Sequence, residues 1–169
     1  MELLSGETYG IREFRTNKCW DWTRNCDGAP YSADIAIMVL DRPIPNAVLG
    51  EDYVNIWNAE TMESVAGRDF ILAGWGSSGE LREDGSTDHH GIEIFHRGYN
   101  NVNEIRNNML VYTMDQDGLP LEAMGHSGDS GSGAFIDIDG TLLIAGVKSN
   151  GEGATWGSEN EYTRVGGIA

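Results

Sequence analysis

The sequence predicts an all-β protein, for three reasons. Its apolar segments are short, turn-forming residues separate them throughout the chain, and glycine alone contributes 23 residues. Only residues 47–60 and 101–108 hint at helix, and neither stretch keeps a 3.6-residue period. Many short strands with regular turns are typical of a β-sandwich or a β-barrel, and periodicity does not choose between the two.

The expected strands follow one another along the chain as apolar segments bounded by turn signals. The clearest pairing joins 134–138 to 141–147, because Asp139-Gly140 supplies the positive φ angles that a tight hairpin turn needs. In chain order the expected strands are 34–40, 68–76, 91–98, 108–115, 132–140, 141–149 and 161–165.

Composition limits the functional classes. A chain of 169 residues with 40% hydrophobic content is long enough for one domain or for most of one. Its 27 acidic and 11 basic residues give a net charge of −16, so we expect neither nucleic acid nor a membrane as a partner. The apolar runs are far shorter than the ~18 residues of a membrane span, and a soluble chain is expected. The opening MELLSGETYG is unlike a secretory signal, so any export signal would lie upstream.

The stretch GHSGDSGSGAF, residues 125–135, surrounds one serine with small residues. A serine hydroxyl needs a base, and its attack on a carbonyl needs donors for the oxyanion that forms. Gly128 and Gly131 would let the backbone turn sharply enough for the N–H groups of Gly128 and Ser130 to face one oxygen. Taken alone, GDSG also fits an ordinary polar turn.

Three other features are ambiguous when each is taken alone. Asp34 precedes an apolar segment, and a carboxylate at the mouth of a buried strand needs a partner such as an imidazole; a strand-capping aspartate fits equally well. The stretch ILAGWG, residues 71–76, predicts a buried Trp75 between closely packed backbones. Cys19 and Cys26 either close a short loop or remain separate thiols.

In their order and spacing, these motifs resemble those of the trypsin-like serine proteases. Members of that family carry the triad aspartate before an apolar strand, then Gly-Trp-Gly, the nucleophile in Gly-Asp-Ser-Gly, a substrate-binding strand and a Tyr-x-x-Val. The stretches 95–116 and 121–135 also look like microbial secreted members, which lack most of the animal disulfides. The matching motifs are DIAIMVL, GWG, GDSGSG, GVKSNGEG and EYTRV, and the resemblance covers almost the whole chain.

The resemblance implies a fold of two six-stranded Greek-key β-barrels of the trypsin-like type, the first of them incomplete here. About residues 1–60 would be the remainder of the first barrel, and about 61–169 would be the second barrel, which carries the nucleophile. The resemblance also favours a disulfide between Cys19 and Cys26 and, with it, a secreted or extracytoplasmic location.

The resemblance further assigns roles to single residues. Ser130 would be the nucleophile and Asp34 the carboxylate that orients the base, while the N–H groups of Gly128 and Ser130 would form the oxyanion hole. Asp129 matches the aspartate that pairs with a newly freed N-terminus on activation. Ser149 matches the serine that hydrogen-bonds the triad aspartate. The backbone of Ser149, Asn150 and Gly151 would hold an extended substrate by strand addition.

The sequence departs from the family in its histidines and at its ends. In the family the catalytic histidine precedes the triad aspartate, whereas every histidine here follows it. His89 and His90 are expected in solvent, and His96 is expected to be structural. His126 is expected beside the specificity pocket, on the wrong side of the nucleophile to act as its base. The chain also lacks the family's mature start and its terminal helix, so we expect a fragment. Because one triad member is missing, this fragment is expected to be nearly inactive. The histidines are His89, His90, His96 and His126.

Specificity is expected to depend on Met124, which matches the floor of the primary pocket. A thioether cannot pair with a basic side chain, so an apolar substrate residue is expected there. Asn160 matches a pocket-wall glycine and would narrow the pocket, and His126 replaces a family cysteine. Ser132-Gly133 in place of the usual Gly-Pro is a milder change that leaves the nucleophile turn plausible.

The sequence therefore predicts a serine endopeptidase that forms an acyl-enzyme on Ser130 and whose general base lies outside this chain. The alternative is a catalytically inactive homologue that acts as a protein-binding domain. The expected partners are a peptide or protein substrate and protein protease inhibitors. We expect no cofactor and no metal site, because the acidic loops DQDG and DIDG are too short for an EF-hand.

Overall fold

The computed structural model describes residues 7–17, 19, 34–45, 54–57, 65–89, 91 and 94–166. The chain divides into two compact units, Met1–Val54 and Asn55–Ala169. Every regular element in the described ranges is a strand, which confirms the prediction of an all-β protein. The assignment of about 1–60 and 61–169 to two barrels stays a prediction.

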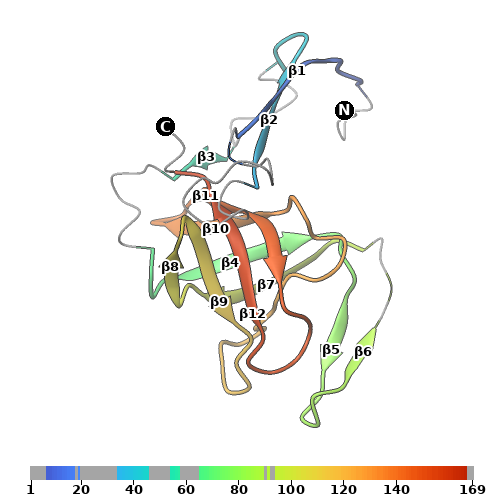
Figure 1. Ribbon diagram of the computed structural model, residues 1–169, viewed down its shortest axis with the longest axis vertical. Coiled ribbons are helices and arrows are strands. Elements are labelled where there is room, and N and C mark those ends of the chain that lie inside the picture. The colour runs from blue at the N-terminus through green and yellow to red at the C-terminus, as the bar shows by residue number, and fades with distance from the viewer. Residues whose placement is uncertain are drawn as a thin grey trace. The chain divides into compact units, whose positions relative to one another are not determined.

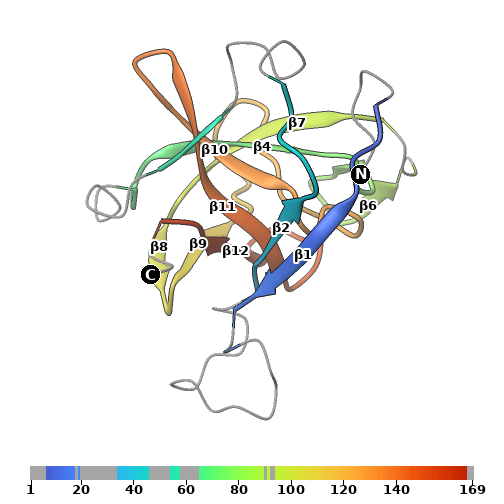
Figure 2. The same cartoon turned by 90° about the horizontal axis from the view of Figure 1, so that it is seen from above.

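In the described residues of the first unit, β1 (Ile11–Thr16) and β2 (Ala36–Leu40) form an antiparallel pair (Figure 2). Strand β2 falls within the predicted segment 34–40. Strand β1 was not predicted, because its sequence, IREFRT, mixes charged and apolar residues. The prediction that β2 is buried is wrong, because Ile37 and Met38 are 58% and 49% exposed.

The second unit is built on a curled antiparallel sheet in the order β7-β4-β10-β11-β12-β9-β8 (Figure 1). A short strand, β3 (Asn55–Ile56), pairs in parallel with β11, and β5 (Gly79–Leu81) forms a separate hairpin with β6 (Thr87–His89). The strands of the main sheet are β4 (Asp69–Gly74), β7 (His96–Asn101), β8 (Glu104–Arg106), β9 (Met109–Thr113), β10 (Gly133–Ile138), β11 (Thr141–Gly151) and β12 (Glu159–Arg164).

The concave side of this sheet encloses an aromatic core. The rings of Phe70, Tyr112 and Tyr162, all buried, pack with centroids 5.1 to 6.0 Å apart. Buried Asn100 on β7 joins two distant strands of the curl, because its Nδ2 donates to Thr113 O on β9 at 2.9 Å and to Ala123 O at 3.0 Å. The curl therefore brings β7 and β9 together through a side chain.

Two hairpin turns show how local chemistry sets the topology. Asp139 and Gly140 have φ angles of 52° and 83°, so the predicted hairpin between β10 and β11 is confirmed. The hint of helix at 101–108 is wrong, because β8 and β9 form a hairpin there. Its turn places Asn107 and Asn108 at positive φ, which asparagine tolerates better than most residues.

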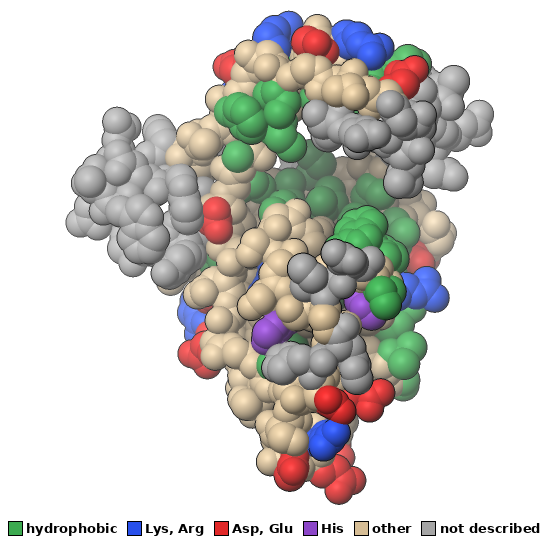
Figure 3. All heavy atoms as spheres, turned by 90° about the vertical axis from the view of Figure 1, so that its right-hand side faces the viewer, with side chains coloured by type: hydrophobic (Ala, Val, Ile, Leu, Met, Phe, Trp, Pro, Cys, Tyr) green, Lys and Arg blue, Asp and Glu red, His purple; other side chains and the backbone are tan. Residues whose placement is uncertain are grey.

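The β5–β6 hairpin lies within the region predicted only as turns. Arg82, which directly follows β5, pairs with Asp88 on β6 at 2.6 Å and thereby connects the two sides of the hairpin near its turn. Figure 3 shows red acidic side chains around a basic one at the lower end of the view, where this hairpin ends. Both partners of this ion pair are at least half exposed, so its contribution to stability is about 1 kcal/mol or less.

Candidate active site

Ser130 lies in an exposed loop that precedes β10 and is fixed to β11. Gly128 and Gly131 have φ angles of 95° and 85°, in the region that favours glycine, so the backbone path accounts for both. Gly131 N donates to Lys148 O at 3.0 Å, and Lys148 N donates to Ser132 O at 2.8 Å. These two bonds hold the serine loop against the end of β11.

The Asp129 side chain connects this loop to the GWG motif through hydrogen bonds. Its carboxylate accepts hydrogen bonds from Gly76 N at 2.8 Å and from His126 N at 2.9 Å. A Cβ atom on Gly74 or on Gly76 would overlap the Asp129 carboxylate. Because both glycines of the motif lack a side chain, the Asp129 carboxylate fits against it. The GWG motif and the serine loop, which are far apart in the sequence, therefore pack together.

The prediction that Trp75 is buried is wrong. Its side chain is 61% exposed and packs against exposed Phe95, with ring centroids 4.6 Å apart. Burial alternates along the second half of β4 and places Gly74 inward, so the next residue points outward. The motif accommodates Asp129 and does not bury its tryptophan.

The N–H groups of the serine loop alternate between bonded and open. Asp129 N donates to His126 O at 3.0 Å, and Gly131 N is bonded to β11. Neither Gly128 N nor Ser130 N donates to any acceptor in the described part of the chain. The two amides predicted for an oxyanion hole are therefore available to a ligand.

The predicted substrate strand has one open edge. Strand β10 begins at Gly133, which lies opposite Val147, so β11 continues beyond its partner. Asn150 and Gly151 pair with β12 on one side, and no described strand pairs with these two residues on the other. An extended peptide can add to such an edge through its main chain. This edge begins where the serine loop is tied to β11.

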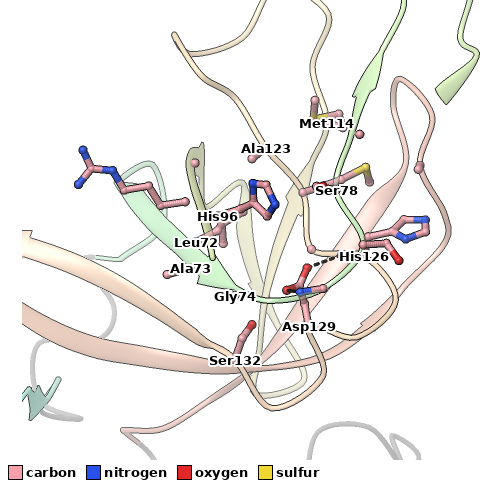
Figure 4. A pocket seen from close by; sticks show the side chains of 18 of the residues that line it. Leu72, Ala73, Gly74, Ser78, His96, Met114, Ala123, His126, Asp129 and Ser132 are labelled. Atoms are coloured by element: carbon pink, nitrogen blue, oxygen red, sulfur yellow. Dashed lines mark hydrogen bonds between the residues drawn. The ribbon is translucent and has the colours of Figure 1, made fainter. Parts of the chain in front are cut away.

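A cavity of about 240 Å³ lies behind the serine loop (Figure 4). Met124, predicted as the pocket floor, lines it together with His96, His126, Asp129 and Tyr162. Figure 4 shows the rings of His96 and His126 well apart in this view. The Ser130 hydroxyl has no hydrogen bond to either histidine among the described residues.

Lys148 introduces a buried cation that the sequence analysis did not single out. Its side chain is 6% exposed, and its Nζ donates to Asn160 Oδ1 at 2.7 Å and to the Asn150 carbonyl. The Nζ atom also lies 5.9 Å and 5.4 Å from the ring centroids of Tyr112 and Tyr162. Burial lowers the pKa of Lys148 to about 8, and burial raises the pKa of both tyrosines.

The remaining predicted residues belong elsewhere. Asp34 is half-buried just before β2 in the first unit, and the structure describes that unit separately from the unit that holds Ser130. Pairing of the two residues therefore stays a prediction. Cys26 and His90 lie outside the described residues, so the bridge with Cys19 is also untested. His89 ends β6.

No protein-family model matches the chain, and no curated protein matches its sequence. The family hypothesis therefore rests on the motifs and on the geometry of the serine loop. Within the described ranges, no group of three His, Cys, Asp or Glu side chains could hold a metal ion. The same ranges contain no helix long and apolar enough to cross a membrane.

Proposed function

We propose that the chain carries the nucleophile and the oxyanion donors of a trypsin-like serine endopeptidase. The observation that carries the proposal is the serine loop, in which the N–H groups of Gly128 and Ser130 are open while those of Asp129 and Gly131 are bonded. The open pair stands beside an open strand edge, where an extended peptide would bring its carbonyl oxygen to both amides. The proposal includes a fold of two Greek-key barrels, of which the curled sheet would be part of the second.

In the proposed reaction, Ser130 Oγ forms a bond to the carbonyl carbon of a peptide while a general base takes the hydroxyl proton. The carbonyl oxygen becomes an oxyanion that accepts hydrogen bonds from Gly128 N and Ser130 N. The C–N bond then breaks, and the leaving amine takes the proton from the base. Water attacks the resulting ester, releases the acid and restores the serine.

Two parts of this machinery come from outside the described serine loop. The general base would be a histidine beyond these 169 residues, because none precedes Asp34 in the sequence. Asp34 would orient that histidine and stabilise its charged form. The proposal implies an extracytoplasmic location, a Cys19–Cys26 disulfide, peptide or protein substrates, and protein protease inhibitors as partners.

A second function, a catalytically inactive homologue that binds proteins, is favoured by one observation. The Ser130 hydroxyl has no hydrogen-bonded base in the described part of the chain. Such a homologue would use the open edge of β11 for binding without chemistry.

Reaction of the full-length gene product with a fluorophosphonate separates the two functions. An active serine forms a phosphonyl ester, so the native protein should be labelled and Ser130→Ala should not. Asp34→Asn should slow the labelling by orders of magnitude without unfolding the protein. A natively folded full-length protein that remains unlabelled would reject the endopeptidase in favour of the binding domain.

A further inference from the structure

Among the described residues, the buried Lys148 ammonium has no counter-ion. Asp129 and Glu161 attract it from a distance, but no carboxylate of the described residues pairs with it. The Asp129 oxygens accept from two backbone amides, and those of Glu161 face Arg106 and Asn150 Nδ2, each at 3.4 Å. A buried charge is costly unless it is paired, so this ammonium lacks the partner that would best stabilise it.

The amide of Asn160 presents a second unused donor at the same place. Its Oδ1 accepts from Lys148 Nζ, and this bond fixes which end of the amide is oxygen. Asn160 is only 1% exposed, and its buried Nδ2 has no hydrogen-bond acceptor in the part of the chain that the structure describes. Buried polar groups are nearly always bonded, so an unused N–H₂ beside an unpaired ammonium is well suited to an anion.

Two glycines pack directly against this donor pair, beside the serine loop. A Cβ on exposed Gly151 would lie 3.2 Å from Lys148 Nζ and would overlap Asn160 Oδ1. A Cβ on Gly125 would lie 2.7 Å from the Lys148 Cε. Gly125 also lines the cavity behind the loop, and Gly151 belongs to the open edge of β11. Only backbone therefore separates the ammonium from the two surfaces that a bound peptide would use.

We propose that Lys148 Nζ and Asn160 Nδ2 form an anion subsite that takes the carboxylate of a glutamate or aspartate side chain, on the residue just before the scissile bond. This inference rests on the proposed function, because it assumes that a peptide lies along β11 with its carbonyl at Ser130. A carboxylate there supplies the missing counter-ion and accepts from both donors. Acidic substrates replace the apolar preference expected from Met124.

The test compares peptides that differ only in charge at this residue. The full-length gene product carrying Ser130→Ala is titrated calorimetrically with acetyl-Ala-Ala-Pro-Glu-amide and with its isosteric Gln counterpart. The Glu peptide should bind more tightly by a factor on the order of 10 to 100, typical of a charge-assisted hydrogen bond. Lys148→Met should abolish this ratio, whereas Arg82→Met removes an exposed positive charge of the same unit and should preserve it.

A second variant keeps the test decisive if Lys148→Met does not fold. Asn160→Asp supplies an internal carboxylate to Lys148, so the protein should melt at a higher temperature and lose its preference for the Glu peptide. Retention of that preference in a folded Asn160→Asp protein would overturn the subsite.

Fluorophosphonate labelling of the protein with Ser130 intact distinguishes the two proposals. Labelling with equal affinity for both peptides overturns the acidic subsite and leaves the endopeptidase standing. A Lys148-dependent preference without labelling supports the subsite and rejects catalysis. Equal affinity without labelling overturns both.

Discussion

Replacement of Lys148 by methionine should change how the stability of the protein depends on pH. Burial lowers the pKa of this lysine from 10.5 to about 8, against the attraction of Asp129 and Glu161. Between these values the unfolded chain holds a proton that the folded chain has released. The free energy of unfolding of the wild type should therefore rise with pH through this window. Methionine takes up no proton, so this rise should disappear in the variant.

The structure sets the size of the effect. A pKa that falls from 10.5 to about 8 corresponds to about 3 kcal/mol over the whole window, at about 1.4 kcal/mol per pH unit. About 2 kcal/mol of this should be gained between about pH 7 and about pH 9.5. Tyr112 and Tyr162 face the same ammonium, and their raised pKa values keep them protonated in the folded chain over this range.

Urea unfolding of the wild type, Lys148→Met and Arg82→Met, at several pH values in this range, measures the effect. The difference in the free energy of unfolding between the wild type and Lys148→Met should change by about 2 kcal/mol over this range. The free energy of unfolding of Arg82→Met should follow that of the wild type. If the free energies of unfolding of the wild type and of Lys148→Met varied with pH in the same way, the burial of a charged Lys148 would be refuted.

Three further predictions concern the framework of the site, each measured by urea unfolding. Gly76→Ala should cost about 1–3 kcal/mol because its Cβ meets the Asp129 carboxylate, and less when Asp129 is also changed to alanine. Asn100→Ala should cost about 1–3 kcal/mol because two carbonyls lose their buried donor, and Asn101→Ala, whose amide bonds are exposed, should cost less. Gly140→Ala should cost about 1–2 kcal/mol from its positive φ alone, because no atom lies within 4 Å of the added Cβ.

Local chemistry made part of the fold predictable. Asp139-Gly140 strongly favours a hairpin between the two apolar segments that flank it, and apolar runs such as 108–115 contain their strands. The stretch 101–108 gave no such signal, because β8 is only three residues long and its partner β9 stabilises it. Residues in β1 and β5 alternate poorly, so pairing and not sequence pattern defines those strands.

The site was predictable where a motif constrains the backbone, and not where burial depends on distant partners. Gly128 and Gly131 indicate the sharp turns of the serine loop, because only glycine readily adopts their φ angles. Lys148 lies directly opposite Tyr162 on β12, and that register makes it buried. A single lysine after the apolar run LLIAGV was the available signal, since lysine is rarely buried without a partner.

The most direct test of the proposed function is the position of the fluorophosphonate adduct in the full-length gene product. Peptide mass mapping of the natively labelled protein should find a single phosphonylated residue, Ser130, and urea-unfolded protein should carry no adduct. An adduct at another serine, or equal labelling of folded and unfolded protein, would contradict the assignment of Ser130 as the nucleophile.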